Sequence, residues 1–301
     1  MSERRRTDPI PLGGGDEPYS KGLMARALMR VGVSAVRAYE VARRIEQDLL
    51  SSKQDSIELD RVEELAGDVL GESEGVDAVR RLRRYGELAE LDLPVIVLIG
   101  GATGTGKSTV ATEVAYRLGV TRVTSTDFVR QTLRAFFSPE FMPSIHYSSF
   151  EAGRALRSAE AEEVDPLLHG FLDQTRNVLV GVNAAIERSL AEGWSTVLEG
   201  VHLVPGLTAP IADALVVQCV LAIQSEDAHA SHFWIRDVAS EGARSLDKYL
   251  DHLGDIRYLQ DYIVERAERE EVPVIWNKDR DGATSAVLEL VLTAAERLEK
   301  V

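Results

Sequence analysis

Val95-Ile96-Val97-Leu98-Ile99-Gly100-Gly101-Ala102-Thr103-Gly104-Thr105-Gly106-Lys107-Ser108-Thr109 is the stretch that decides the fold. A short apolar run leads into a glycine-rich turn, and a helix-forming segment begins at the Lys-Ser-Thr that follows. The run over 95–99 is apolar on both faces, as is typical of a central strand in a parallel sheet. From Gly101 the spacing is G-x-x-x-x-G-K-[ST], which predicts a loop that holds the phosphates of a nucleoside triphosphate.

The chemistry of such a loop depends on backbone N–H groups that converge on one anion. Glycines allow the required turn, and the helix after the loop directs the positive end of its dipole at the same anion. Lys107 is expected to reach the β- and γ-phosphates, and the Ser108 hydroxyl to bind Mg²⁺. The predicted nucleotide-binding residues are Gly101, Ala102, Thr103, Gly104, Thr105, Gly106, Lys107, Ser108 and Thr109.

The composition limits the remaining possibilities. The chain has 301 residues, a formal net charge of −15 and one cysteine, Cys219, so a disulfide framework is excluded. The sequence has no apolar run of about 18 residues and no secretory signal, and we expect a cytoplasmic protein without a membrane partner. The negative charge argues against a nucleic-acid partner, and an anionic substrate would need a local group of Arg and Lys.

The hydrophobic pattern divides the chain into three parts. Residues 1–17 are charged and rich in Pro and Gly, which predicts a flexible segment, and 18–92 contain four helical segments. Residues 93–301 alternate helices with five apolar segments, which predicts an α/β three-layer sandwich of the P-loop kinase type around a five-stranded parallel sheet. The predicted strands lie at 95–99, 122–126, 195–200, 215–223 and 272–277.

Two acidic residues are predicted to end strands beside the loop. Asp127 ends the second strand, where it is a candidate to accept a proton from a substrate hydroxyl; the alternative is N-capping of the next helix. Arg130, one turn later, is a candidate to hold a carboxylate or phosphate. Glu199 ends the third strand and is a candidate Mg²⁺ ligand or a solvent-facing charge. His202 either orients the substrate or packs.

The segment between the fourth and fifth strands carries Arg236, Arg244 and Lys248. In small-molecule kinases such a segment closes as a lid and brings cations to the transferring phosphoryl group. Arg236 is therefore a candidate catalytic residue, and Arg244 and Lys248 are candidates for substrate binding. The alternative is a solvated helix face.

Together these motifs resemble the 2-phosphoglycerate kinase family. The resemblance rests first on the phosphate loop, on Ser-Thr-Asp-Phe-Val-Arg at 125–130 and on Leu-Glu-Gly-Val-His at 198–202. It rests also on His232-Phe233 with Arg236 and on the run 256–262. It covers about residues 17–300 and implies an enzyme that transfers the ATP γ-phosphoryl group to 2-phosphoglycerate, giving 2,3-bisphosphoglycerate. It also implies that 18–92 form an ATP-cone-like domain, with a helical packing domain as the alternative.

We therefore expect an ATP- and Mg²⁺-dependent kinase for a small anionic hydroxy acid, with 2-phosphoglycerate as the acceptor that the resemblance implies. One alternative keeps the kinase and changes the acceptor to another sugar acid, a nucleoside or a nucleotide-sugar. A second is a nucleotide-sensing regulator without turnover. The sequence leaves open whether the chain forms a homo-oligomer.

Overall fold

The computed structural model describes residues 10–13, 18–156, 165–239 and 246–299. Contacts between Cα atoms divide the chain into two compact units: Met1–Asp92, Tyr116–Val120 and Leu292–Val301 form unit 1, and Leu93–Ala115 with Thr121–Val291 form unit 2. Two segments of the predicted kinase domain, 116–120 and 292–301, thus group with unit 1. Within the described residues, no helix is both long and apolar enough to span a membrane.

In unit 1, the described residues 18–92 form four helices that pack around an apolar core. They are α1 (Lys21–Arg30), α2 (Ala35–Ser52), α3 (Leu59–Leu70) and α4 (Glu72–Glu90). Ser20 caps α1 by accepting a hydrogen bond from the Leu23 amide, whereas the Ser34 side chain before α2 makes no such bond. The assignment of 18–92 as ATP-cone-like remains a prediction.

The described part of the N-terminal segment is packed rather than loose. Ile10 and Leu12 lie against the core of unit 1, and Gly13 forms an antiparallel bridge with Ser56. The Ile57 amide donates a hydrogen bond of 3.0 Å to the carbonyl oxygen of Leu12. The prediction of a flexible segment is therefore wrong for 10–13, because apolar side chains follow the charged start of the chain; residues 1–9 and 14–17 lie outside the described residues.

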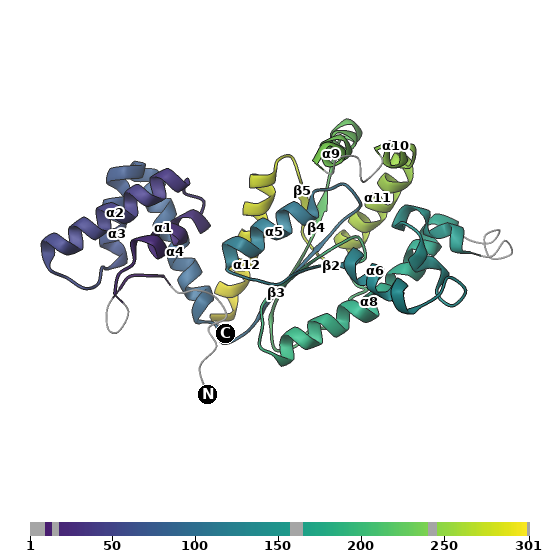
Figure 1. The fold of residues 1–301 in the computed structure, drawn as a ribbon, viewed down its shortest axis with the longest axis horizontal. Helices are drawn as coiled ribbons and strands as arrows, with labels where there is room; N and C mark the ends of the chain where they lie inside the picture. The colour runs from purple at the N-terminus through teal and green to yellow at the C-terminus, as the bar shows by residue number, and fades with distance from the viewer. Residues whose placement is uncertain (1–9, 14–17, 157–164, 240–245, 300–301) are drawn as a thin grey trace. The chain divides into compact units, whose positions relative to one another are not determined.

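Unit 2 is built on a five-stranded parallel sheet, which confirms the predicted fold class (Figure 1). The strands are β1 (Val95–Gly100), β2 (Val123–Ser125), β3 (Thr196–Glu199), β4 (Leu215–Ala222) and β5 (Val274–Trp276). Their order is β2-β3-β1-β4-β5, and β1 is buried along its whole length between β3 and β4. The central position of β1 explains why its sequence is apolar on both faces.

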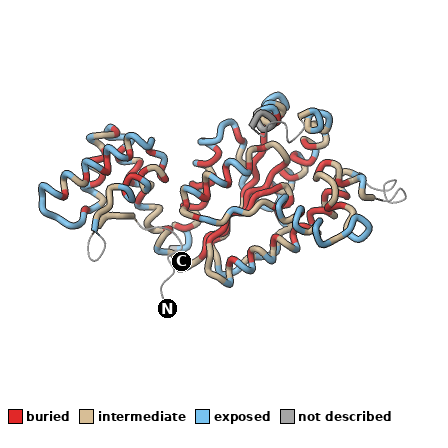
Figure 2. The backbone as a smooth tube through the Cα atoms, viewed as in Figure 1, coloured by how far each residue is buried: buried red, intermediate tan, exposed pale blue. Residues whose placement is uncertain are grey.

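Helices cover both faces of this sheet. Figure 1 shows α5 (Lys107–Leu118) and α12 (Arg280–Glu299) on one face, and α6 (Thr126–Phe136), α8 (Pro166–Ala191) and α11 (Leu253–Arg269) on the other. The burial view shows the consequence: the central strands β1 and β3 are buried, and the exposed residues gather on the outer sides of the helices (Figure 2). Two further helices, α9 (Glu226–Ala239) and α10 (Leu246–Asp251), lie between β4 and α11 in the sequence.

Several predicted boundaries are wrong in ways that affect the site. The second strand ends at Ser125, so Asp127 lies in the first turn of α6 rather than at a strand end. The segment between α6 and α8 contains two 3₁₀ turns, η1 (Pro143–His146) and η2 (Ser149–Ala155). Gly170 lies inside α8, where its missing side chain lets Ala152 approach: an added Cβ would lie 2.4 Å from the Ala152 carbonyl oxygen.

Candidate active site

The glycine-rich loop joins β1 to α5 at the carboxyl end of the sheet. Gly101, Gly104 and Gly106 have φ values of +133°, +88° and +87°, which side chains disfavour. A Cβ on Gly101 would lie 2.1 Å from the Leu221 carbonyl oxygen. Glycine is thus required both for the conformation of the loop and for its close packing on the neighbouring strand.

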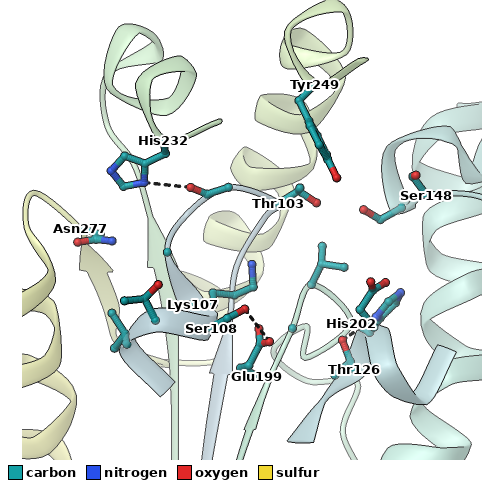
Figure 3. Close-up of a pocket in the computed structure, with 18 of the residues that line it drawn as sticks. Thr103, Lys107, Ser108, Thr126, Ser148, Glu199, His202, His232, Tyr249 and Asn277 are labelled. Carbon is teal, nitrogen blue, oxygen red and sulfur yellow. Dashed lines mark hydrogen bonds between the residues drawn. The ribbon is translucent and has the colours of Figure 1, made fainter. Parts of the chain in front are cut away.

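A cavity of about 830 Å³ opens at this loop (Figure 3). Its walls come from the loop, the start of α6, the turn at 148–150, the end of β3, α9, α10 and the connection between β5 and α12. The volume falls in the usual range of small-molecule sites. Of the predicted site residues, the cavity brings together Thr103, Gly104, Gly106, Lys107, Ser108, Thr109, Asp127, Arg130, Glu199 and His202.

Lys107 lies inside the curve of the loop. Only 8% of the residue is exposed, and its Nζ donates a hydrogen bond of 2.6 Å to the Ala102 carbonyl oxygen. Burial lowers the pKa of Lys107, and the nearby Glu199 and Asp127 carboxylates act in the opposite direction. The loop therefore holds a cation where an anion bound by the loop amides would meet it.

Ser108 and Glu199 form a pair of oxygen donors at the mouth of the loop (Figure 3). The Ser108 hydroxyl donates a hydrogen bond of 2.8 Å to Glu199 Oε1, and only 6% of Glu199 is exposed, which excludes the solvent-facing alternative. Hydroxyl and carboxylate oxygens are ligands that suit Mg²⁺. No group of three or more His, Cys, Asp or Glu side chains among the described residues could hold a metal, so an ion here would need oxygens from a ligand or water.

Asp127 faces the cavity from the first turn of α6. Ser125 caps this helix by accepting a hydrogen bond from the Phe128 amide, so the capping alternative for Asp127 is wrong. The Asp127 side chain is 63% exposed, and its Oδ1 accepts hydrogen bonds from Arg130 Nε (3.0 Å) and Nη2 (2.8 Å). Its carboxylate is thus accessible and is held by a cation.

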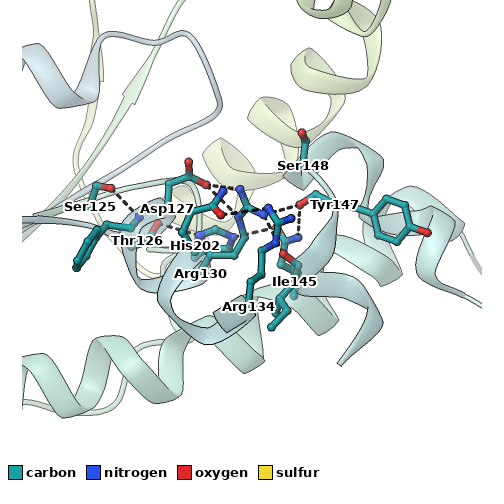
Figure 4. Close-up of polar contacts among 12 residues, drawn as sticks. Ser125, Thr126, Asp127, Arg130, Arg134, Ile145, Tyr147, Ser148 and His202 are labelled. Atoms are coloured by element: carbon teal, nitrogen blue, oxygen red, sulfur yellow. Dashed lines mark hydrogen bonds and ion pairs between the residues drawn. The ribbon is translucent and has the colours of Figure 1, made fainter. Parts of the chain in front are cut away.

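Arg130 is directed mainly at the protein itself (Figure 4). Its side chain is 8% exposed, and Nη1 donates hydrogen bonds to the carbonyl oxygens of Ile145 (2.8 Å) and Tyr147 (2.9 Å). With the two bonds to Asp127, four of its five N–H directions are used. The guanidinium thereby ties α6 to the turn at 145–147, and contact of Arg130 with a substrate anion stays a prediction.

His202 lines the cavity and also belongs to the same hydrogen-bonded support (Figure 4). The Gln174 amide nitrogen donates to the carbonyls of Ser144 and Tyr147, which leaves Gln174 Oε1 to accept from His202 Nε2 at 3.0 Å. His202 Nδ1 then accepts from the Thr126 hydroxyl at 2.8 Å. Burial lowers the pKa of His202 to about 3, so the ring is neutral and its two nitrogens already have partners.

The predicted lid cations are only partly described. Arg244 lies outside the described residues, and Arg236 lies in α9 with a side chain outside the description. Lys248, on α10, places its Nζ 2.5 Å from Glu151 Oε2, and Glu151 is 9% exposed. In this structure Lys248 therefore fastens α10 to η2.

Sequence reasoning missed several residues of the cavity wall: Ser148, Ser149, Tyr249, Asp279 and Arg280 line it as well. Single polar side chains such as these give no periodic signal, so only the tertiary fold reveals them. His229 and His232, which contact the loop from α9, were also missed as functional groups, although His232 was one of the residues that carried the family resemblance.

Comparison with known proteins supports the same family. No protein-family model matches the chain. The chain is 34% identical over 281 residues to a 2-phosphoglycerate kinase of Thermococcus kodakarensis, covering 93% of this chain and 95% of the relative. It is 38% identical over 265 residues to a 2-phosphoglycerate kinase of Methanothermobacter thermautotrophicus, covering 87% and 86%.

Among solved structures, shikimate kinase from Bacteroides thetaiotaomicron is 17% identical with a TM-score of 0.29, covering 69% of this chain and 99% of that one. The relatives share about a third of their residues with this chain over nearly their full length. The chain therefore belongs to the 2-phosphoglycerate kinase family.

Proposed function

We propose that this protein transfers the γ-phosphoryl group of ATP to the hydroxyl of 2-phosphoglycerate and releases ADP and 2,3-bisphosphoglycerate. The observation that carries the proposal is the cavity itself. Lys107 and Ser108 of a complete phosphate loop face two acidic side chains, Glu199 and Asp127, in a chain of this family. A phosphate loop alone would serve ATP hydrolysis equally well. A second wall with carboxylates suits phosphoryl transfer, because a carboxylate can accept the proton of the acceptor hydroxyl.

The nucleotide side of the cavity provides electrostatic stabilisation. The loop amides and Lys107 would hold the β- and γ-phosphates, and Lys107 would offset charge that grows on the bridging oxygen as the γ-phosphoryl group leaves. Ser108 and Glu199 would hold Mg²⁺, an ion that neutralises phosphate charge in such reactions. The pair fits the ion by its chemistry, since both are hard oxygen donors and lie 2.8 Å apart.

The acceptor side provides the proton acceptor. The 2-phosphoglycerate hydroxyl oxygen forms a bond to the γ-phosphorus, the bond from that phosphorus to the β,γ-bridging oxygen breaks, and the hydroxyl proton passes to the Asp127 carboxylate. Asp127 is suited to this because its side chain is 63% exposed toward the cavity while Arg130 holds its orientation. Positioning of the acceptor in line with the γ-phosphate would supply much of the rate enhancement.

The test is a direct assay with purified protein, MgATP and 2-phosphoglycerate. We expect ADP in step with 2,3-bisphosphoglycerate, which ³¹P NMR identifies by its second phosphate resonance. Glycerate and 3-phosphoglycerate serve as comparison acceptors. ADP release no greater than the background without acceptor would overturn the proposal, and faster release with another acceptor would replace the substrate while keeping the kinase.

A variant separates the base assignment from the overall reaction. Asp127→Asn removes the proton acceptor and retains the shape of the side chain, and we expect kcat to fall at least about 100-fold because general-base catalysis usually contributes that much. Unchanged turnover in this variant would mean that Asp127 is not the base, even if the kinase reaction is observed.

A further inference from the structure

Three side chains from outside the phosphate loop each contact one of three consecutive loop carbonyls. The bonds join His229 Nε2 to Thr103 O (2.8 Å), His232 Nδ1 to Gly104 O (3.0 Å) and Asn277 Nδ2 to Thr105 O (2.9 Å). The carbonyl before them, that of Ala102, accepts from Lys107 Nζ and the Thr105 hydroxyl within the loop. Four successive loop carbonyls thus have side-chain donors.

The direction of these bonds shows which ring nitrogen of each histidine carries a proton. A carbonyl oxygen only accepts, so His229 carries its proton on Nε2 and His232 on Nδ1. Burial lowers the pKa of His229 to about 4, which makes its ring neutral near pH 7. His229 Nδ1 and Asn277 Oδ1 are buried and have no hydrogen-bond partner among the described residues. Such unpaired atoms are unfavourable, and their presence indicates a constraint beyond stability.

The packing around these bonds is tight. A Cβ on Gly104 would lie 2.5 Å from the Phe233 ring, and one on Gly106 would lie 2.6 Å from Asn277 Nδ2. The Phe233 ring is buried and stacks on His229, with ring centroids 5.3 Å apart, and on Tyr249, with centroids 5.0 Å apart. The outer side of the loop is therefore closed by α9, α10 and the residue after β5.

The contacts have a consequence for the inner side of the loop. The C=O and N–H of one peptide group point in opposite directions, because the group is planar and trans. Donors that hold the carbonyls outward therefore help keep the corresponding amides turned toward the anion-binding side. A loop held in this way loses less conformational entropy when a phosphate binds, and affinity rises accordingly.

We propose that His229, His232 and Asn277 are positioning residues that hold the phosphate loop in its anion-binding conformation before nucleotide binds. The inference rests on the proposed function only in that the loop binds ATP. It concerns residues outside the G-x-x-x-x-G-K-[ST] pattern, two of them on the helix that also carries Arg236. The position of α9 is thereby coupled to the geometry of the loop.

The two histidines use different nitrogens, and this allows a crossed rescue experiment. The amide nitrogen of Asn lies about where His Nδ1 lies, and that of Gln about where His Nε2 lies. His232→Asn should therefore keep the bond to Gly104, whereas His232→Gln and His232→Ala lose it. For the fully buried His229 the order reverses, so that His229→Gln retains binding and His229→Asn does not.

The readout is the Kd of MgATP and of Mg-tripolyphosphate, measured by isothermal titration calorimetry. Tripolyphosphate has no base or sugar and reports the loop alone. We expect His232→Ala and His232→Gln to raise both Kd values by the same factor, about fivefold to tenfold, as for loss of one hydrogen bond. His232→Asn should stay within about twofold of the wild type. Trp234→Ala, at an exposed neighbour on α9, is the matched control and should bind normally.

Two outcomes would overturn the inference. If His232→Asn weakens binding as much as His232→Ala, or if only MgATP binding weakens, His232 contacts the nucleotide directly and does not act through the loop. Equal binding by all His232 variants would likewise overturn it. A wild-type protein that binds neither probe would instead contradict the nucleotide half of the proposed function. His232 carries the decisive test because it is only partly buried, so its variants should fold.

Discussion

The phosphate side and the acceptor side of the cavity use their charged residues in opposite ways. On the phosphate side, Lys107 and the Ser108–Glu199 pair face the cavity, and side chains from outside the loop donate to the loop carbonyls. On the acceptor side, Arg130 and His202 use most of their hydrogen-bonding groups within the protein. There they support the cavity wall that the turns at 143–155 form. Asp127 is the exposed carboxylate of that wall.

The difference has a physical origin. A loop can bind an anion with backbone amides, so its supporting groups only need to hold carbonyls, and neutral side chains do this without adding a competing charge. The turns at 143–155 have few regular backbone hydrogen bonds, and buried carbonyls such as those of Ile145 and Tyr147 need donors from elsewhere. Arg130 and Gln174 supply them.

The largest effect should come from the phosphate side. Lys107→Met removes the cation next to the transferring group, and we expect kcat to fall about 100- to 1,000-fold, as for loss of other electrostatic contacts to a transition state. ADP release with 2-phosphoglycerate measures this. Lys53→Met, at an exposed residue after α2, should keep full activity; comparable activity in both variants would contradict the role given to Lys107.

Arg130→Met should affect the acceptor side and leave the phosphate side intact. The change removes donors from two backbone carbonyls, so we expect the free energy of unfolding to fall by about 2 kcal/mol. The KM for the acceptor should rise while the Kd of MgATP stays unchanged. Arg134→Met, on the exposed side of the same helix, is the control. A lower kcat with unchanged acceptor KM and stability would instead favour direct contact of Arg130 with the transferring group.

Acid should weaken the acceptor side through His202. Its pKa is about 3 in the folded protein and about 6.5 when unfolded, so only the unfolded state takes up this proton as the pH falls through that window. Stability is therefore lost on acidification, by about 2 kcal/mol between about pH 7.5 and about pH 5. Urea unfolding at both pH values measures the free energy of unfolding, and its loss on acidification should be smaller by that amount in His202→Gln than in the wild type. The titration of His229 acts in the same direction, but it is common to both proteins and cancels in the comparison.

The smallest effect is expected at Lys248. Because its Nζ pairs with Glu151 and the side chain is 46% exposed, Lys248→Gln should change kcat/KM by less than about threefold. Steady-state kinetics with both substrates measure this. A fall of kcat by two orders of magnitude would show instead that Lys248 reaches the phosphoryl group, as the sequence analysis predicted for a lid cation.

The sequence predicted the fold well where one local signal was enough. The apolar run at 95–99 and the glycine spacing identified the central strand and the loop, and five strands alternating with helices indicated the parallel sheet. Boundaries were less accurate where hydrogen bonds outside the segment decide the conformation. Asp127 was expected directly after a strand that ends at residue 126, yet Ser125 already caps α6 and Asp127 lies in its first turn.

The hydrogen-bond partners of Arg130 and His202 could not be predicted from the sequence for a related reason. A buried Arg and a substrate-binding Arg have the same local sequence, and only the position of the carbonyls of Ile145 and Tyr147 distinguishes them. His202 was left as either a substrate contact or a packed residue, and the hydrogen bonds to Thr126 and Gln174 favour the second.

The sequence by itself determined the phosphate loop, because glycine conformations and the adjacent Lys107 and Ser108 are local properties of one short segment. The tertiary structure alone decided what holds that loop. The donors to its carbonyls lie 126, 128 and 172 residues farther along the chain, and no local pattern shows which carbonyl a distant histidine or asparagine will meet. A carbonyl's partner is set by packing, which depends on the whole fold.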